Sequence, residues 1–230
     1  MIRIDVEQGS SKWHLLRYGI VTASEADELV TPKKWEPTSG EKREKYLCRK
    51  IGERIALAET ADIEDAIERA AKIERMLNRV QTESMLHGVV SEPRAVNAYE
   101  FLTGNETEAA GFIMNDTKTA GASVDRMIKG TKRGLEIKSP FSLGVYVGYC
   151  LSKGVDAAYL PQLIFQLWVA DLESIDIYAW YEGRSESKPV TVPRDEEKIK
   201  RLAELHAEFN DRLEDEWKLW QGGLYTVTRV

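Results

Sequence analysis

Hydrophobic and polar positions divide the chain into a helical first part, a middle part with the character of strands, and a helical end. The clearest helix covers residues 62–80, where apolar side chains recur at helical spacing and charges occupy the opposite side. Thr38-Ser-Gly-Glu41 has the spacing of a capping box and predicts a helix from there to about residue 58. Shorter helices are expected over residues 11–18 and 90–102.

The middle part, residues 107–138, has short apolar stretches and a turn at Lys129-Gly130-Thr131-Lys132, which together predict three antiparallel strands. Two helices, a strand with a partner and a long final helix are expected after it: residues 143–152, 157–171, 175–182 with 189–193, and 195–221. This order predicts one domain over residues 1–230. Its class is α/β (α+β), with a small mixed sheet flanked by helices.

Composition places the chain among ordinary globular proteins. Of its 230 residues, 43% are hydrophobic and 30% charged, and no apolar run approaches the roughly 18 residues that cross a membrane. The first residues lack the pattern of a secretory signal, so we expect a cytoplasmic protein with no membrane partner. The net charge of −6 argues against a protein that coats nucleic acid, but not against one that binds DNA in a local basic groove.

Cysteine and histidine are too scarce to build the common metal sites that use them. Two cysteines and three scattered histidines cannot form a four-ligand zinc or iron–sulfur site from side chains of those types. Any metal must therefore be held mainly by oxygen, and Mg²⁺ is an ion that takes oxygen ligands.

One pattern in the middle part has the chemistry to hold such a metal. Asp125 precedes Glu136-Ile137-Lys138, and period-two alternation sends Glu136 and Lys138 to the same face of a strand. The hairpin turn between the segments would bring Asp125 beside them. Two converging carboxylates can position Mg²⁺ on a scissile phosphate, and a neighbouring lysine can orient or deprotonate the attacking water. The pattern therefore indicates a nuclease.

The motif alone is weak, because [Asp/Glu]-x-Lys triplets occur five times in the chain. They begin at Asp116, Glu136, Glu186, Glu196 and Glu216. Only Glu136 sits in an apolar strand, whereas a turn-like stretch or a charged helix surrounds those from Glu186 onward. A surface strand with ordinary charges stays the alternative at this point.

Three segments together resemble the lambda exonuclease family and the related YqaJ-type viral recombinases, within the PD-(D/E)xK nuclease superfamily. They are WHLLRYGIVTAS from Trp13, ASVD from Ala122 with LEIKSPF from Leu135, and AYLPQLIFQLWV from Ala158. Their order and spacing match over about residues 5–185. The resemblance implies a restriction-endonuclease-like core.

The resemblance also implies the catalytic roles. Asp125 and Glu136 would bind the metal ions, with the backbone carbonyl of Ile137 as a further ligand, and Lys138 would position or activate the water. Gln162 would hydrogen-bond that water or a backbone phosphate. One helical turn later, Gln166 is a weaker candidate on a similar face.

Glu92 matches an acidic residue on the preceding helix, which could serve a metal or orient Lys138. The alternative is a first-turn glutamate stabilised by the helix dipole. The sequence departs from the family at Val124 and Arg126, where proline and glycine are frequent, and at residues 58–85, which look like an expansion. The basic residues among 42–54 are mixed with glutamates, and a solvated helix face is expected there.

Arg17, Ser24 and Ser123 match residues that form a pocket for a terminal 5′-phosphate. A guanidinium binds phosphate in a forked geometry, and hydroxyls beside a helix N-terminus add donors. A surface arginine is the alternative for Arg17, while Trp13 is expected to be a packing residue and Thr22 to be able to serve as a cap.

By resemblance we expect a Mg²⁺-dependent 5′→3′ exonuclease that acts on the ends of double-stranded DNA. It would release mononucleotides and leave 3′ single-stranded tails for recombination by single-strand annealing. Two Mg²⁺ ions per site are expected, with Mn²⁺ as a substitute. The expected partners are duplex DNA with a 5′-phosphorylated end, a single-strand annealing protein, and further copies of the chain in a ring-shaped homotrimer. A phage or prophage origin in a bacterial host would follow.

Three other functions stay open. A restriction-like endonuclease could share the same core, and it would nick a closed circle of DNA. A non-catalytic module that binds DNA ends is the second, although Asp125, Glu136 and Lys138 are intact. A glycosidase-like hydrolase could also use two carboxylates, but it would require neither Lys138 nor Arg17 nor a divalent metal.

Overall fold

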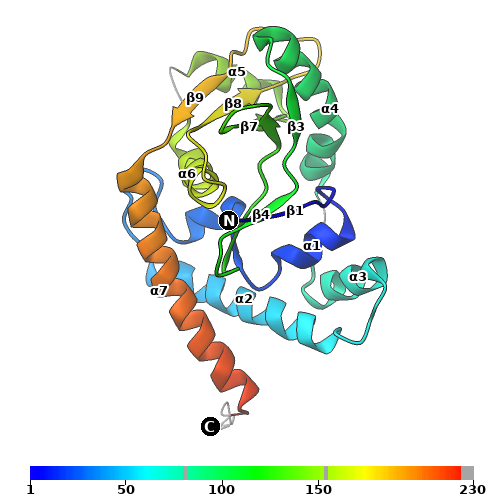
Figure 1. Ribbon diagram of the computed structural model, residues 1–230, viewed down its shortest axis with the longest axis vertical. Helices are drawn as coiled ribbons and strands as arrows, with labels where there is room; N and C mark the ends of the chain where they lie inside the picture. The colour runs from blue at the N-terminus through cyan, green and yellow to red at the C-terminus, as the bar shows by residue number, and fades with distance from the viewer. Residues whose placement is uncertain (80–81, 153–154, 224–230) are drawn as a thin grey trace.

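The computed structural model describes residues 1–79, 82–152 and 155–223 and arranges them as two small mixed sheets among helices (Figure 1). The α-helices are α1 Ser11–Arg17, α2 Gly40–Glu59, α3 Ala66–Met76, α4 Glu83–Thr103, α5 Leu143–Leu151, α6 Leu160–Val169 and α7 Glu196–Gln221. Two 3-10 helices are η1 Ala23–Glu28 and η2 Ala157–Tyr159. The strands are β1 Ile2–Ile4, β2 Val21–Thr22, β3 Thr107–Ala109, β4 Phe112–Met114, β5 Ala120–Ala122, β6 Arg126–Ile128, β7 Arg133–Lys138, β8 Ser174–Ala179 and β9 Val190–Pro193.

The larger sheet has the strand order β3-β6-β7-β8-β9, and the smaller one β1-β4-β5-β2. In the larger sheet, β6 runs antiparallel to β7, whereas β7 and β8 are parallel from Arg133↔Ser174 to Lys138↔Ala179. Parallel neighbours need a crossover connection, and α5, η2 and α6 supply it between β7 and β8. The crossover therefore brings α6 onto the sheet beside β7.

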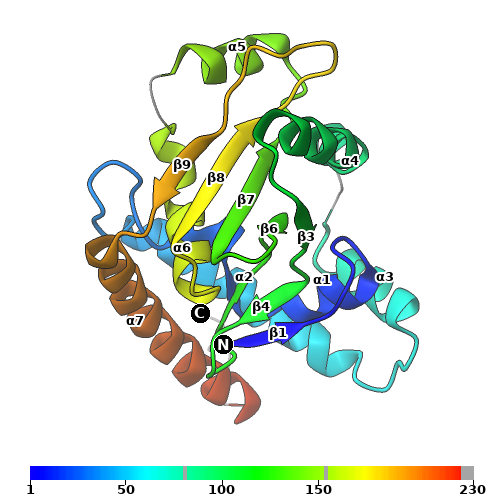
Figure 2. The same cartoon turned by 45° about the horizontal axis from the view of Figure 1, so that its top comes forward.

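Helices cover both faces of the larger sheet, as Figure 2 shows for α4 and α6. On one face, α4 packs its buried Ala95, Val96 and Tyr99 against Leu135 and Ile137 of β7. Because side chains alternate along a strand, Glu136 and Lys138 then face the other side, which α6 covers. β7 thus presents an apolar face to α4 and a polar face to α6.

The main core lies between α6, η1, the sheets and α7. α6 is buried along most of its length and contributes Leu163, Ile164, Phe165 and Leu167 to this core. α7 packs on α6 and α2 through one apolar stripe: Ile199, Leu202, Leu205, Phe209 and Leu213. This packing fixes the position of α6, the helix that covers the polar face of β7.

The α/β class and the mixed sheet flanked by helices are confirmed. The expectation of three antiparallel strands over residues 107–138 is wrong, since that range holds five strands shared between two sheets. Four of the five have only three residues, which is too short for period-two alternation to separate them in a sequence.

Helix boundaries also differ from those expected. The helix predicted over residues 62–80 covers only Ala66–Met76, because Asp65 caps its start and Asn78 adopts a φ of +49° just beyond its end. α4 begins earlier than expected, at Glu83, and continues through Pro93. The N-cap of α2 is Ser39 rather than Thr38. No helix of the described residues is long and apolar enough to cross a membrane.

Candidate active site

Glu136 and Lys138 meet on the α6 side of β7, as the alternation predicts. Lys138 Nζ lies 2.7 Å from Glu136 Oε1, and the two side chains are only 20% and 5% exposed. Burial acts to lower the pKa of Lys138, but the charge and hydrogen bond of Glu136 outweigh it and raise that pKa above its usual value. The lysine is therefore held as an ammonium group beside the carboxylate.

Asp125 lies immediately before β6 and reaches β7 from there. Its Oδ2 accepts a hydrogen bond from the backbone N–H of Ile137 at 2.7 Å, so the carboxylate lies beside the Glu136-Ile137-Lys138 segment. Burial, followed by the negative charges of Glu136 and Glu92, raises the pKa of Asp125 well above its usual value. The charged form of Asp125 is therefore disfavoured, and a bound cation would stabilise it.

The carbonyl of Ile137 points to the same place. In a strand, the N–H and C=O of one residue point to the same side, and the N–H of Ile137 points at Asp125. The pairing of β7 with β6 ends opposite Leu135, two residues earlier. The Ile137 carbonyl therefore lies on the side of Asp125 beyond the end of β6, where it can add an oxygen.

These donors fit Mg²⁺ by type, because they are carboxylate and carbonyl oxygens. Within residues 1–79, 82–152 and 155–223, no group of three or more His, Cys, Asp and Glu side chains is placed to hold a metal ion. Asp125 and Glu136 would thus need the Ile137 carbonyl, water and substrate oxygens to complete the octahedral shell of Mg²⁺. An incomplete protein shell is typical of sites where Mg²⁺ also binds a substrate phosphate.

Two glutamines of α6 hold Glu136 from the opposite side. Gln162 Nε2 donates to Glu136 Oε1 at 2.8 Å, and its Oε1 accepts from Lys138 Nζ at 3.2 Å. One turn later, Gln166 Nε2 donates to Glu136 Oε2 at 2.7 Å and to the carbonyl of Ser123 at 2.9 Å. Gln166, the weaker candidate in the sequence, is fully buried and contacts the same carboxylate as Gln162.

Glu92 approaches the site from α4. Burial raises the pKa of Glu92, while the charge of Arg126 acts to lower it and that of Glu136 to raise it. Glu92 and Glu136 therefore interact through their charges. The hydrogen bonds of Lys138 described above go to Glu136 and Gln162 rather than to Glu92. The alternative of a first-turn glutamate is wrong, because α4 begins nine residues earlier, at Glu83, and continues to Thr103.

The three residues expected to bind phosphate come together. Arg17, the last residue of α1, donates to Ser24 Oγ at 2.8 Å and to Ser123 Oγ at 3.4 Å. Its guanidinium also lies 4.1 Å from the centroid of the Trp13 ring. No ion pair between Arg17 and a carboxylate occurs among the described residues, so its direct partners leave the cation available to an anion.

Trp13 does more than pack. Its indole N–H donates to Ser123 Oγ at 2.8 Å, which fixes the hydroxyl that Arg17 also contacts. Thr22 is the N-cap that the sequence allowed, since its backbone N–H donates to Glu25 Oε2 at 3.3 Å in a capping box at the start of η1, and its hydroxyl donates to the same oxygen. The indole of Trp13 therefore supports the group formed by Arg17, Ser24 and Ser123.

The group of Arg17, Ser24 and Ser123 lies next to the carboxylates. Ser123 and Asp125 are two residues apart, and Gln166 hydrogen-bonds both the Ser123 carbonyl and Glu136. Two further contacts had no recognisable signal in the sequence. Gln8 Nε2 donates to Asp125 Oδ1 at 3.4 Å, and the ring of Tyr159 lies 4.9 Å from Lys138 Nζ.

Arg126 and five basic residues of α2 make contacts within the chain. Arg126 binds the hydroxyl and carbonyl of Thr107. Ion pairs with acidic residues hold Lys42, Lys45, Arg49, Lys50 and Arg54. The expectation of a solvated helix face is wrong for Lys50, which is 1% exposed.

Comparison with known proteins places the chain in a family. The sequence model of the YqaJ-like viral recombinase domain matches residues 12–173, which include every residue of the site except Gln8. No curated protein matches the chain.

Solved structures share the fold. An alkaline exonuclease from Laribacter hongkongensis is 20% identical, with a TM-score of 0.75 over 95% of this chain and 100% of that one. The same enzyme in complex with dAMP gives 19% identity and a TM-score of 0.74 over the same shares. A phage-related exonuclease from Haemophilus somnus 129PT is 14% identical, with a TM-score of 0.55 over 88% of this chain and 98% of that one.

Proposed function

Because this chain belongs to the family of YqaJ-like viral recombinase domains, we propose that it is an exonuclease acting on the ends of double-stranded DNA. One observation carries the proposal. The buried carboxylates of Asp125 and Glu136 lie with Lys138 beside a pocket whose arginine is paired with hydroxyls. A metal-dependent phosphodiesterase needs the first group, and recognition of a phosphorylated end needs the second.

The metal ligands in this proposal are Asp125, Glu136 and the Ile137 carbonyl. Mg²⁺ is the proposed ion, two per site, with Mn²⁺ as a substitute. When bound, the metal supplies charge stabilisation on the phosphate and a more acidic water. The residues of the chain supply orientation: Gln162 and Gln166 bind both oxygens of Glu136 and so fix the direction in which its carboxylate faces.

Lys138 is proposed to position the attacking water. Its ammonium group is held between Glu136 and Gln162, so its remaining N–H can donate toward the substrate side. Glu92 adds negative charge to the site, whereas the hydrogen bonds of Lys138 go to Glu136 and Gln162. We therefore propose that Glu92 supports the metal ions through its charge rather than by orienting Lys138.

The direction of digestion follows from the position of the phosphate pocket. Arg17, Ser24 and Ser123 can hold a terminal 5′-phosphate, and Ser123 is two residues from Asp125. The next phosphodiester of the same strand would then lie at the carboxylates. Cleavage there releases a mononucleotide and leaves a new 5′-phosphate, so repetition proceeds 5′→3′ and leaves a 3′ single-stranded tail.

We further propose that the protein works as a ring-shaped homotrimer together with a single-strand annealing protein, in a phage or prophage setting. A ring would allow a basic channel to coexist with acidic outer faces, which suits a net charge of −6. The mass of the assembly in solution, measured by light scattering, tests the trimer.

The test of the function is digestion of linear duplex DNA with and without 5′-phosphates, beside a covalently closed circle. We expect Mg²⁺-dependent loss of the phosphorylated linear DNA, no loss of the circle, and no digestion by Lys138→Ala. Nicking of the circle would favour the restriction-like endonuclease. End binding without any digestion in Mg²⁺ or Mn²⁺ would favour the non-catalytic module.

A further inference from the structure

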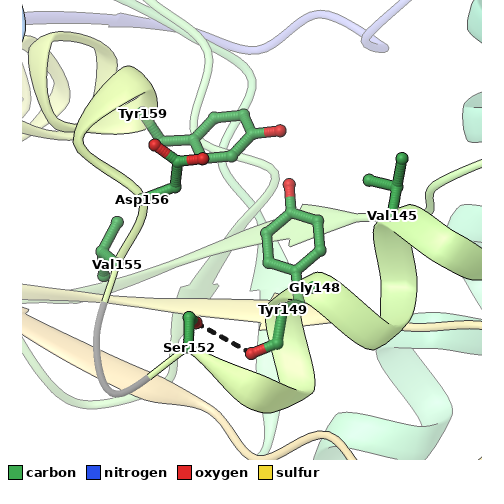
Figure 3. A pocket seen from close by; sticks show the side chains of 7 residues that line it. All are labelled: Val145, Gly148, Tyr149, Ser152, Val155, Asp156 and Tyr159. Carbon is green, nitrogen blue, oxygen red and sulfur yellow. Dashed lines mark hydrogen bonds between the residues drawn. The ribbon is translucent and has the colours of Figure 1, made fainter.

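A cavity of about 590 Å³ opens next to the candidate active site, between α5 and the segment that leads into α6 (Figure 3). Val145 and Tyr149 of α5 line one side, and Val155, Asp156 and Tyr159 line the other. Its size is in the range of pockets that hold small ligands. The roles proposed above for the active-site residues make no use of this cavity.

Two tyrosines join the cavity to the catalytic residues. The rings of Tyr149 and Tyr159 stack with centroids 5.7 Å apart and planes 23° apart. Burial, then the neighbouring Tyr159, raises the pKa of Tyr149, which therefore remains a neutral phenol. The centroid of the Tyr159 ring also lies 4.9 Å from Lys138 Nζ, so the aromatic pair is in direct contact with the lysine of the candidate active site.

The helix α6 sets the order of the subsites. Tyr159 is its N-cap and lines the cavity, Gln162 contacts Lys138, and Gln166 contacts the Ser123 carbonyl. From Tyr159 to Gln166 the helix rises by about 10 Å. The cavity and the phosphate pocket therefore lie toward opposite ends of α6, with Glu136 and Lys138 between them.

The lining of the cavity suits a base better than a phosphate. Among the described residues, its lining includes two aromatic rings and two valines, together with Gly148, Ser152 and Asp156. The Asp156 carboxylate would repel a phosphate and accept hydrogen bonds from the exocyclic amino group of a base. Stacking on tyrosine tolerates any base, as an enzyme that digests DNA of any sequence requires.

We propose that this cavity binds the base of the nucleotide on the 3′ side of the scissile phosphodiester, which extends the Tyr149–Tyr159 stack. The proposal rests on the 5′→3′ function proposed above, because the 5′-phosphate pocket occupies the other end of α6. With the terminal phosphate at Arg17 and the second base at Tyr149, the bond between them is held across Asp125 and Glu136. Tyr149 and Tyr159 are then positioning residues, since they hold the substrate strand and do not touch the reacting atoms.

The test is single-turnover release of the terminal nucleotide from three duplexes with a 5′-phosphate. One is unmodified, one has an abasic site at the second nucleotide of the digested strand, and one has an abasic site far inside the duplex. For the wild-type protein we expect the second duplex to react more slowly than the first, on the order of tenfold, and the third to react like the first.

The variants separate a stacking role from a general loss of structure. Tyr149→Ala should release the terminal nucleotide from unmodified DNA about tenfold more slowly and should no longer distinguish the two abasic positions. Tyr149→Phe keeps the ring and should keep the difference between them. Val147→Ala is the matched control, because Val147 is exposed on the same helix and does not line the cavity.

Equal rates of the wild-type protein on the first two duplexes would overturn the subsite while leaving the exonuclease in place. The same would follow if Tyr149→Ala stayed sensitive to the abasic site at the second nucleotide. If the wild-type protein digests none of the three, the proposed function fails. The affinities of the same proteins for the same duplexes, measured by fluorescence anisotropy, then decide the base-binding subsite separately, and equal affinities would overturn it.

Discussion

Two clusters of buried charge in this molecule differ in their balance. In the first, which we call the balanced cluster, the carboxylates of Glu25 and Glu53 meet the cations of Lys50 and Arg79. Lys50 Nζ lies 2.8 Å from Glu25 and 2.9 Å from Glu53, and Arg79 pairs with the other oxygen of Glu53. Glu53 also accepts the backbone N–H of Gly19, just after α1. Each buried charge therefore has a partner inside the chain.

The second, the acidic cluster, is not balanced. It consists of Asp125, Glu136, Glu92 and Lys138. The lysine contacts Glu136, and burial, followed by repulsion from the other two carboxylates, raises the pKa of Asp125. A protein that needed only stability would not keep such a group, because uncompensated buried charge is costly. The comparison indicates that the balanced cluster supports the fold, whereas we propose that the acidic cluster binds a cation and a substrate.

The largest effect is expected from Asp125→Asn. Loss of a metal ligand should lower the rate of DNA digestion by about a thousandfold or more, because metal stabilisation of the transition state is worth several kcal/mol. The free energy of unfolding should stay equal or rise, since asparagine can still accept from Ile137 N–H and removes a repelled charge. Enzyme assays and urea unfolding measure the two quantities.

The control is Asp116→Asn, the same substitution at an exposed aspartate. Asp116 begins one of the other [Asp/Glu]-x-Lys triplets, and its side chain is 84% exposed. It should leave both activity and stability within experimental scatter. Strong destabilisation by Asp125→Asn would show that the acidic cluster is structural and would remove the contrast with the balanced cluster.

The balanced cluster should give the opposite result. Lys50→Met leaves Glu25 and Glu53 without their shared cation and should lower the free energy of unfolding by about 3–5 kcal/mol, as breaking a buried pair does. Lys45→Met on the same helix is the control, because its pair with Glu41 is exposed and should be worth less than about 1 kcal/mol. Equal unfolding midpoints for the two variants would contradict a structural role for the balanced cluster.

Cation binding should distinguish the clusters directly. Mg²⁺ at about 100 times its dissociation constant should stabilise the wild-type protein by roughly 2.7 kcal/mol, through linkage to the folded state. The rise in the thermal midpoint should disappear in Asp125→Asn. Persistence of that rise in the variant would place the bound Mg²⁺ elsewhere in the molecule.

The smallest of these effects concerns Arg17, Ser24 and Ser123, the residues proposed to bind the terminal phosphate. Arg17→Ala should reduce the preference for 5′-phosphorylated over unphosphorylated ends by about 10- to 100-fold, the worth of charge-assisted hydrogen bonds. The ratio of kcat/KM on the two substrates measures it and corrects for any general loss of activity. An unchanged ratio would show that another group recognises the terminal phosphate.

Asp125, Glu136 and Lys138 of the acidic cluster were open to prediction from sequence because their spacing is local, whereas Glu92 was identified only by the family resemblance. Glu136 and Lys138 share a face through strand alternation alone, and one hairpin brings Asp125 beside them. Arg17, Ser24 and Ser123 are a different case, since 98 residues lie between Ser24 and Ser123 and only the family resemblance joined them. Their convergence depends on the parallel pairing of β2 with β5, which no local pattern indicates.

The balanced cluster was not open to prediction. Charges recur around all sides of α2, so the sequence does not show which side is buried, and Lys50 looked like a surface residue. The partnership of Arg79 with Glu53 also depends on how α3 folds back on α2. Gln166 was undervalued for a related reason: its importance comes from a contact with the Ser123 carbonyl, and a backbone group leaves no trace in a residue pattern.

The most direct test of the central claim uses one linear duplex with different labels on the 5′-terminal and 3′-terminal nucleotides of the same strand. With Mg²⁺, the account predicts immediate release of the 5′ label as a mononucleotide, while the 3′ label remains on a shortening strand. Release of the 3′ label first, or of internal fragments carrying either label, would contradict it.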